Sequence, residues 1–432
     1  MTPGPDPGTP RPEGLSRASP GGGLSRRLGL GDAVMIGLGS MLGAGVFAAF
    51  GPAAAAAGSG LLIALVVAAV VAYANATSSA RLAALHPESG GTYVYGRRRL
   101  GPTWGFVAGW GFVIGKTASC AAMALTLGAY AWPDQARPVA AAAVVVFTAV
   151  NYLGVSKTAR LTRVLVVLTL VALAAVVAGA LTRAGTSTAQ LVDWFPHGPL
   201  GILQAAGLLF FAFAGYARIA TLGEEVRDPA RTIPRAIPLA LGIVVAVYAV
   251  VGATALAAVG PAALAGSAAP LATAADADGG VLAAVVRTGG VVATAGVLLS
   301  LLAGIGRTTL AMARDRELPH HLAAVHPRYR VPHRAELVIG AVVLVLVSTF
   351  DLRTVIGFSS FAVLVYYAIT NSAALTLHRP DDRRRSAVAF LGLAGCLVLA
   401  VTLPPASVIT GAVVLLVGLV GRAVAARLHP RT

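Results

Sequence analysis

The chain has 432 residues, of which 57% are hydrophobic and only 12% are charged, and its mean hydropathy is +0.79. Soluble domains carry about 25% charged residues, so this composition excludes an ordinary soluble globular protein and predicts a membrane protein. The net charge of +16, from 33 basic and 17 acidic residues, by itself also fits a protein that binds nucleic acid. Where the charges lie along the chain decides between these interpretations.

Residues 1–27 are rich in Pro, Gly, Ser and Arg and predict a disordered tail without the apolar core of a signal peptide. Apolar spans then follow almost without interruption, and most reach the roughly 20 residues that cross a bilayer as a helix. We expect twelve of them, at 31–52, 60–85, 103–131, 137–153, 162–182, 200–222, 236–259, 281–312, 335–350, 354–377, 386–403 and 405–425. The predicted protein is therefore an all-α integral membrane protein, with a ten-helix core at 28–378 and two further helices and a short C-terminus at 379–432.

The basic residues alternate from loop to loop. With twelve spans, the loops on the side of the two termini hold 27 of the 33 basic residues, whereas the opposite loops hold four. The positive-inside rule then places both termini in the cytoplasm, with the spans in the plasma membrane. The distribution of positive charge is thus explained by the orientation of the protein in the membrane. We therefore expect a lipid bilayer and no nucleic acid as a partner.

The first and sixth spans are interrupted by small residues. Four glycines, Gly37, Gly39, Gly43 and Gly45, fall within nine residues of the first span, and Ala214–Gly215 interrupts an aromatic stretch in the sixth. Such glycines either serve a close helix contact or form an unwound segment whose free N–H groups meet an anion. The interruptions lie five spans apart and in opposite orientation, which is typical of an inverted repeat with a binding site at the membrane midplane.

Four motifs carry a family resemblance. They are the first-span stretch 39–47 (GSMLGAGVF), the loop 87–95 (PESGGTYVY), the segment 224–234 (EEVRDPARTIP) and the eighth-span end 312–319 (MARDRELP). Over about residues 28–378 the chain resembles the amino acid–polyamine–organocation permeases. The resemblance implies a five-plus-five inverted-repeat fold with two extra helices, first and sixth helices broken at mid-membrane, and transport by alternating access.

The resemblance also implies a substrate site at the two breaks. The substrate carboxylate would meet the first break, at Ser40, Met41, Gly43, Ala44 and Gly45. The α-ammonium group would meet carbonyl oxygens of Phe211, Ala212 and Ala214, next to Gly215. The opposite partial charges of helix ends support this division. Phe211 falls where relatives place an aromatic gate, and packing with Phe210 and Phe213 is the alternative.

Lys116 lies near the middle of the third span, where a charge costs at least about 2.5–3.5 kcal/mol. No Asp or Glu is predicted at that depth, so Lys116 either gives up its proton for part of a cycle or is solvated by carbonyl groups at a helix break. Several relatives carry a lysine in the fifth span, where this chain has Thr169. We expect Lys116 to take over proton coupling, with a structural lysine in a polar crevice as the alternative. Sodium coupling is disfavoured, because the eighth span offers only Ser300 where sodium-coupled relatives place a hydroxyl pair.

A cytoplasmic gate is expected below the sixth span. Arg218 and Glu225 lie seven residues apart on one helical face, which favours an ion pair over a contact with substrate. Glu224 and Glu225 would meet a basic partner such as Arg307 and close the gate, unless they form a solvated face.

These features predict a secondary active transporter, with proton-coupled uptake of small neutral amino acids (proton symport). A cationic side chain would need a carboxylate that the spans do not offer. The alternatives are an amino acid exchanger, a polyamine or cationic amino acid permease, and, from another class, a nutrient sensor that does not transport. The chain shows no HExxH, GxSxG or paired-aspartate motif, so no enzyme is expected, nor a cofactor or a metal. The oligomeric state stays open.

Overall fold

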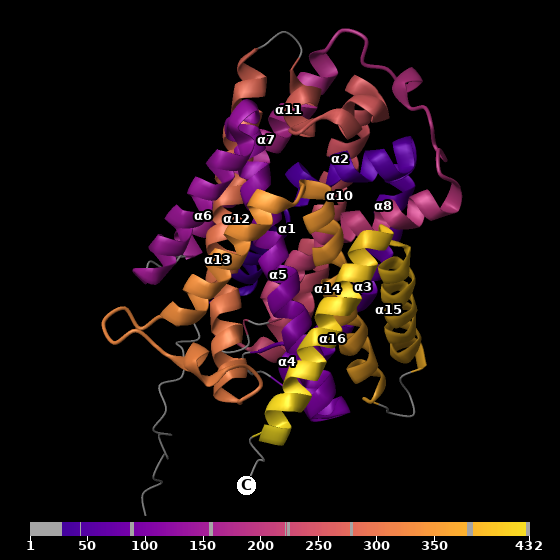
Figure 1. Ribbon diagram of the computed structural model, residues 1–432. Helices are drawn as coiled ribbons and strands as arrows, with labels where there is room; N and C mark the ends of the chain where they lie inside the picture. The colour runs from indigo at the N-terminus through magenta and orange to yellow at the C-terminus, as the bar shows by residue number, and fades with distance from the viewer. Residues whose placement is uncertain are drawn as a thin grey trace, which may run out of the picture.

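The computed structural model describes residues 28–43, 45–86, 90–154, 159–220, 222, 225–276, 280–377 and 383–428. Over these ranges the chain is a bundle of helices, and the only extended pairing is one isolated bridge. Figure 1 shows the bundle with α4 and the end of α16 at the same, lower end.

Within these ranges, nine helical stretches are long and apolar enough to cross a membrane. The helices that form them are α2 (Gly45–Ala57) running on into α3 (Leu61–Leu85), α5 (Pro102–Ala131), α7 (Ala159–Thr182), α8 (Gly198–Phe213) with α9 (Ala217–Ala220), α10 (Pro229–Gly266), α12 (Val281–Arg314), α14 (Leu352–Leu375), α15 (Arg383–Thr402) and α16 (Pro405–Leu428). The protein is therefore a multi-pass helical membrane protein.

The remaining helices are shorter. They are α1 (Leu30–Met41), α4 (Thr92–Leu100), α6 (Ala136–Tyr152), α11 (Pro270–Ala275) and α13 (His333–Thr349). Helices α6 and α13 fall on the predicted fourth and ninth spans, but each has only 17 residues. The count of twelve crossings therefore stays a prediction.

Local sequence explains several helix ends. Gly101 adopts a φ of 104°, which favours glycine, and Pro102 then begins α5 at a position that needs no N–H donor. The Asp351 side chain caps α14 by accepting a hydrogen bond from the Thr354 N–H at 2.7 Å. Helix α10 runs past the predicted end at residue 259 because Gly260, with a φ of 72°, makes a kink before Pro261 rather than an end.

The first and sixth spans are both interrupted. Helix α1 ends at Met41 and α2 begins at Gly45, so the glycine-rich stretch leaves the helix between them. Helix α8 ends at Phe213, and a 3₁₀ turn, Ala214–Tyr216, separates it from α9. In both spans the non-α-helical turn coincides with the small residues that predicted it.

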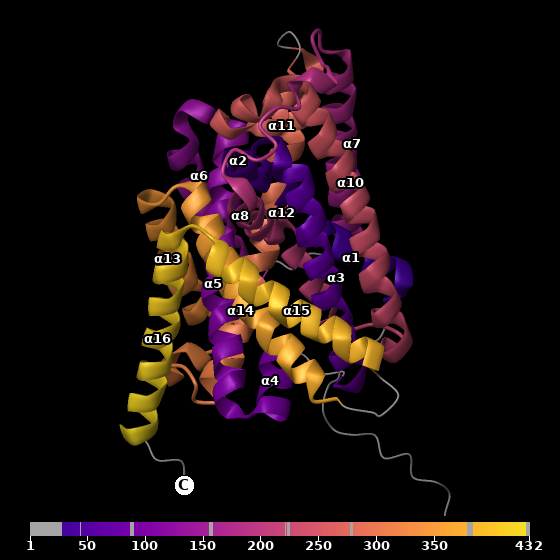
Figure 2. The same ribbon diagram turned by 90° about the vertical axis from the view of Figure 1, so that its right-hand side faces the viewer.

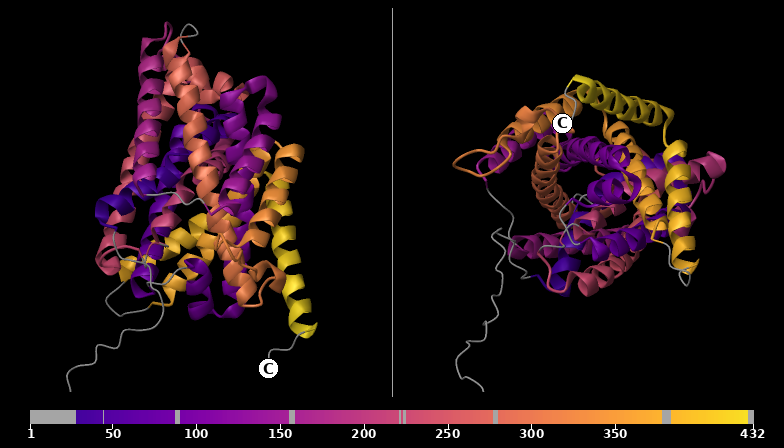
Figure 3. Two further views of the ribbon diagram at one scale, coloured as in Figure 1. Left: turned by 90° about the vertical axis from the view of Figure 1, so that its left-hand side faces the viewer. Right: turned by 90° about the horizontal axis from the view of Figure 1, so that it is seen from below.

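Helix α5 lies in the interior of the bundle, where it packs on α12 and α14, and most of its residues are buried. The hydroxyl groups of Ser119 and Ser359 are 2.7 Å apart across the α5–α14 contact. Helices α15 and α16 lie on the periphery (Figures 2 and 3). Helix α16 is attached to α5 by Trp110, whose indole N–H donates to the Val414 carbonyl at 2.9 Å.

The segment before α1 pairs with the segment that follows α9. Leu28 forms a parallel bridge with Val226. The Leu28 N–H donates to the Glu225 carbonyl at 3.1 Å, and the Arg227 N–H donates to the Leu28 carbonyl at 2.9 Å. The two interrupted spans are thus joined by backbone hydrogen bonds at this end of the bundle.

Candidate functional site

The two interruptions touch each other. A β-carbon on Gly45 would collide with the backbone of Ala212, and one on Gly215 would collide with the carbonyl of Ser40. Glycine therefore lets the start of α2 lie against α8, and lets the 3₁₀ turn lie against the last turn of α1. The structure brings the predicted substrate-binding residues of the two spans into direct contact.

Tyr248, on α10, connects both interruptions. Its buried hydroxyl group lies 2.7 Å from the carbonyl oxygen of Met41 and 3.1 Å from that of Ala212. Tyr367, on α14, donates in the same way to the Ala214 carbonyl at 3.3 Å. Carbonyl groups left without a helical partner at these breaks are thus served by side chains of neighbouring helices.

The other predicted residues of the first break lie around this contact. The hydroxyl of Ser40 donates to the Ile36 carbonyl at 2.9 Å, inside its own helix. Met41 is fully buried, and Gly43 is buried between α1 and α2, close to Val297 of α12. Ala44 lies outside the described residues.

Phe210, Phe211 and Phe213 differ in burial. Phe210 and Phe213 are both 0% exposed. Phe210 packs edge-on against Tyr367 with ring centroids 5.7 Å apart, and Phe213 packs on Tyr248 at 5.2 Å. Phe211 is only partly buried. Packing therefore accounts for two of the three aromatic rings and leaves Phe211 as the one with an accessible face.

Two of the carbonyl groups implied as acceptors for the substrate ammonium already accept tyrosine hydroxyls. These are the carbonyls of Ala212 and Ala214. A carbonyl oxygen has two lone pairs, so each of them can accept a second donor. Because α8 ends and α2 begins at this contact, partial negative and partial positive helix ends lie close together, an arrangement suited to a zwitterion.

Lys116 is buried on α5, with 9% of its surface exposed. No ion pair or hydrogen bond of its side chain is found within the described ranges. Cys120 follows one turn further along α5, and Thr117 uses its hydroxyl locally on the Val113 carbonyl at 2.7 Å. A buried lysine inside a membrane helix and without a carboxylate partner must either lose its proton or have its ammonium group solvated by other polar groups.

The predicted gate residues lie near one another. Arg218, on α9, is within electrostatic range of Glu225 and of Arg307 on α12. Glu224 is outside the described residues. A further carboxylate, Glu336 of α13, lies within electrostatic range of Arg307. Glu336 is only 4% exposed, and one of its carboxylate oxygens has no hydrogen-bond partner among the described residues.

Two of the sequence motifs meet in a cluster of charged side chains. Tyr93 donates to the Asp315 carboxylate at 2.5 Å, and Arg97 reaches the same carboxylate at 3.1 Å. The side chain of Glu317 is almost fully buried, 2.5 Å from Arg422 of α16 and 3.7 Å from Arg97. Burial, and then the hydrogen bond to Asp315, raise the pKa of the Tyr93 hydroxyl. The cluster ties α4, the end of α12 and α16 together.

Sequence reasoning missed three residues of the site. Tyr248 and Tyr367 are single aromatic residues inside long apolar spans, and their contacts with Met41 and Ala214 join positions more than 150 residues apart. The one available signal is that carbonyl groups in an unwound segment need hydrogen-bond donors, which a buried tyrosine hydroxyl can supply. Glu336 stands in the first turn of its helix, where an acidic residue is common for reasons of helix stability alone.

Comparison with known proteins shows the family of this chain. A family model described as amino acid permease matches residues 28–421. An uncharacterised transporter of Mycobacterium tuberculosis is 64% identical over 396 residues, which cover 91% of this chain and 90% of that protein. A branched-chain amino acid permease of Bacillus subtilis is 27% identical over 92% of both chains. A chloroplastic cationic amino acid transporter of Arabidopsis thaliana is 27% identical over 82% of this chain and 66% of its own length. With a match across almost its whole length, the chain belongs to the amino acid permease family.

Proposed function

We propose that this protein is a secondary active transporter that takes up amino acids across the plasma membrane by alternating access, with both termini in the cytoplasm. The observation that carries the proposal is the direct contact between the two helix interruptions at Gly45–Ala212 and Gly215–Ser40. Such a contact brings together helix ends of opposite partial charge, where the two ends of an amino acid can bind. Family membership supports the same function.

The proposed architecture has twelve crossings, arranged as a five-plus-five inverted repeat followed by two peripheral helices. The matching interruptions in α1–α2 and α8–α9 support the repeat. The outer position of α15 and α16 supports their place outside it (Figure 3). In this arrangement Ser40, Gly43 and Gly45 receive the substrate carboxylate, and carbonyl groups at the end of α8 receive its ammonium group.

The proposed substrates are small neutral amino acids. Met41, Phe211 and Val297 at the two breaks are apolar, the polar side chains there carry hydroxyl groups, and none of the described residues at the breaks supplies a carboxylate for a cationic substrate. The similarity to a branched-chain amino acid permease points in the same direction. Similarity to a cationic amino acid transporter keeps cationic substrates as the second candidate.

Coupling to protons is assigned to Lys116. Its burial and its lack of a carboxylate partner among the described residues favour a side chain that exchanges a proton during the cycle. The charged groups Arg218, Glu225 and Arg307 form the proposed gate on the cytoplasmic side.

Uptake into proteoliposomes tests the proposal. Purified protein is given labelled amino acids one at a time, under an imposed pH gradient and with or without sodium. Proton-coupled transport predicts accumulation of small neutral amino acids that follows the pH gradient and ignores sodium. Uptake that ignores both gradients but needs an amino acid inside the vesicle would show an exchanger. Binding without any transport would contradict the proposal and favour a sensor.

A further inference from the structure

Two asparagine side chains form a buried amide pair between α3 and α14. Asn371, on α14, donates from Nδ2 to Oδ1 of Asn75, on α3, at 2.6 Å. Both asparagines are fully buried. The thiol of Cys396, on α15, donates to the same Asn75 oxygen at 3.3 Å. The pair thus joins three helices that lie far apart in the sequence.

Helix α15 approaches this pair closely because it carries a glycine there. A β-carbon on Gly392 would lie 2.6 Å from Oδ1 and 2.8 Å from Nδ2 of Asn371. Glycine therefore lets the backbone of α15 lie against the amide. The three joined helices, α3, α14 and α15, all pack against α8, which ends at the second interruption. The amide pair therefore lies in the wall that supports the helix whose carbonyl groups are proposed to bind the substrate ammonium.

The amide pair is linked to the substrate site through Tyr367. Nδ2 of Asn371 also donates to the backbone carbonyl of Tyr367, one turn back on α14, at 2.9 Å. The Tyr367 hydroxyl in turn donates to the Ala214 carbonyl at 3.3 Å, and its ring stacks on that of Tyr216 with centroids 5.0 Å apart. One amide nitrogen thus holds both the neighbouring helix α3 and the turn of α14 from which Tyr367 reaches the interruption.

Stability alone does not account for an amide pair in this place. Within the described ranges, Nδ2 of Asn75 and Oδ1 of Asn371 have no hydrogen-bond partner. A buried polar atom without a partner destabilises a fold, whereas a pair of apolar side chains of the same shape in its place can be neutral or stabilising. The presence of two amides here therefore favours a role in holding Tyr367 over a role in stability.

We propose that Asn75 and Asn371 are positioning residues for substrate recognition, which hold α14 so that Tyr367 orients the Ala214 carbonyl toward the ammonium group of the substrate. This role rests on the proposed transport function. The tyrosine hydroxyl occupies one lone pair of the carbonyl oxygen and leaves the other for the substrate. Without the amide pair the carbonyl loses its fixed direction, so the ammonium group binds more weakly, while binding of the carboxylate is unchanged.

Uptake kinetics in proteoliposomes test this proposal with the double variant Asn75→Leu with Asn371→Leu, which removes both amides and leaves neither one unpaired. The probes are labelled L-alanine and L-valine. We expect the double variant to unfold at the wild-type temperature, to keep the maximal uptake rate, and to show a KM raised about tenfold. A lower unfolding temperature or maximal rate with an unchanged KM would show a purely structural role and overturn the proposal.

Analogues without the amino group show which end of the substrate is affected. Propionate and isovalerate differ from the two probes only in this group, and they serve as competitors of labelled uptake. We expect each of them to inhibit the wild type and the double variant to the same extent, because neither analogue has an ammonium group to lose a contact. If the double variant binds the analogues and the amino acids more weakly by the same factor, the whole site is distorted and the proposal is wrong.

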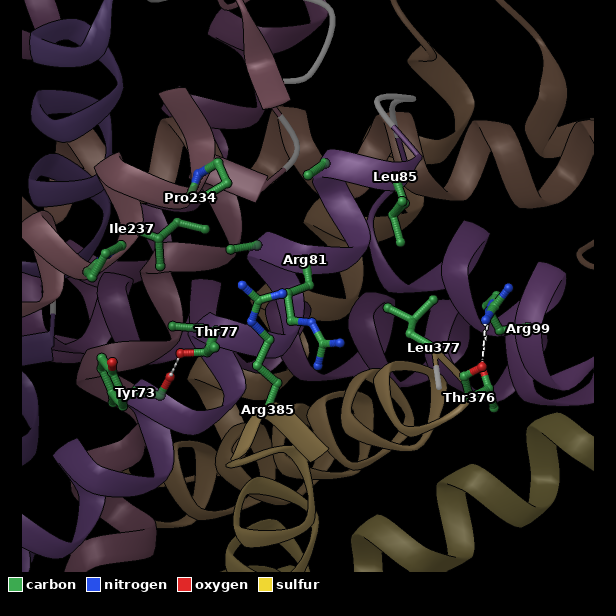
Figure 4. A pocket seen from close by; sticks show the side chains of 14 residues that line it. Tyr73, Thr77, Arg81, Leu85, Arg99, Pro234, Ile237, Thr376, Leu377 and Arg385 are labelled. Carbon is green, nitrogen blue, oxygen red and sulfur yellow. Dashed lines mark hydrogen bonds between the residues drawn. The ribbon is translucent and has the colours of Figure 1, made fainter. Parts of the chain in front are cut away.

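Thr376→Val is the matched control on α14. The Thr376 hydroxyl accepts from Nε of Arg99, at the end of α4, at 2.9 Å in the lining of a pocket of about 620 Å³ (Figure 4). It therefore also ties α14 to another helix, but it lies more than two turns beyond Tyr367. The control is expected to keep the wild-type KM, and an increase equal to that of the double variant would contradict the assignment. A wild type that takes up neither probe would instead overturn the proposed function, and this role with it.

Discussion

The hydroxyl group of Tyr248 lies 2.7 Å from the carbonyl oxygen of Met41, the last residue of α1, and also reaches the Ala212 carbonyl on α8 at 3.1 Å. One side chain of α10 thus holds both interrupted spans at the point where they meet. This contact leads to the first prediction.

Replacing Tyr248 by Phe keeps the ring and removes the O–H that contacts both carbonyl groups. A buried polar group left without its partner costs about 1–3 kcal/mol, so we expect lower thermal stability and uptake reduced about tenfold. Tyr152→Phe is the control, since the Tyr152 ring packs on His326 and no hydrogen bond of its hydroxyl is found among the described residues. If both variants transport like the wild type, Tyr248 does not hold the site.

Gly45→Ala and Gly215→Ala test the contact between the interruptions. Each added methyl group would collide with backbone atoms of the other span, and overpacking costs about 1–3 kcal/mol or more. We expect both variants to lose uptake, and to recover none of it at higher substrate concentration. Gly242→Ala, on α10, is the control, because nothing lies within 4 Å of the new methyl group and alanine favours the helix. Normal uptake by Gly45→Ala and Gly215→Ala would refute the close contact.

Lys116→Met tests proton coupling. Because the variant lacks the lysine proposed to exchange the proton, we expect uptake that no longer responds to the pH gradient, while exchange between internal and external substrate persists. Thr117→Val, at the next residue, removes only a local hydrogen bond and is expected to retain coupling.

Glu336→Gln tests a second buried ionisable group. Glu336 has an unpartnered oxygen within the described ranges and can also hold a proton. If Lys116 carries the coupled proton, Glu336→Gln keeps the response to the pH gradient. Loss of the response in Glu336→Gln with its retention in Lys116→Met would move the assignment to Glu336.

Arg422→Gln tests the attachment of α16. It removes the closest partner of the buried Glu317 carboxylate, and breaking such a pair costs about 3–5 kcal/mol, less here because Arg97 remains at 3.7 Å. We expect a clear fall in the unfolding temperature in detergent, with substrate selectivity unchanged. Arg427→Gln, exposed on the same helix, should leave the unfolding temperature as it is.

The raised pKa of Tyr93 predicts a pH effect on stability. Because the folded protein holds the phenolic proton more tightly than the unfolded chain does, stability falls as the pH rises above about 10. Tyr93→Phe should therefore lose less stability between pH 10 and 11 than the wild type. Equal losses, measured by thermal unfolding across this range, would show that Tyr93 does not contribute.

Most helix positions and both interruptions could be predicted, because apolar runs and glycine clusters are local properties of the chain. The start of α5 at Pro102 and the end of α1 at Met41 follow from residues next to them. The 3₁₀ turn at Ala214–Tyr216 falls on the pair of small residues that predicted it.

Contacts across the bundle could not be predicted in the same way. Tyr248 looks like any aromatic residue of an apolar helix until its hydroxyl is seen beside Met41. The contact between Tyr93 and Asp315 likewise joins residues that are 222 positions apart in the sequence. Such features arise from packing, which periodicity and composition do not encode.

The backbone pairing of Leu28 with Val226 has a mechanical consequence. Helices α1 and α9 approach this pairing from different halves of the chain, and hydrogen bonds on both sides of Leu28 join the two segments. We therefore expect a displacement of α1 to be transmitted to the segment that follows α9, so that the two move together.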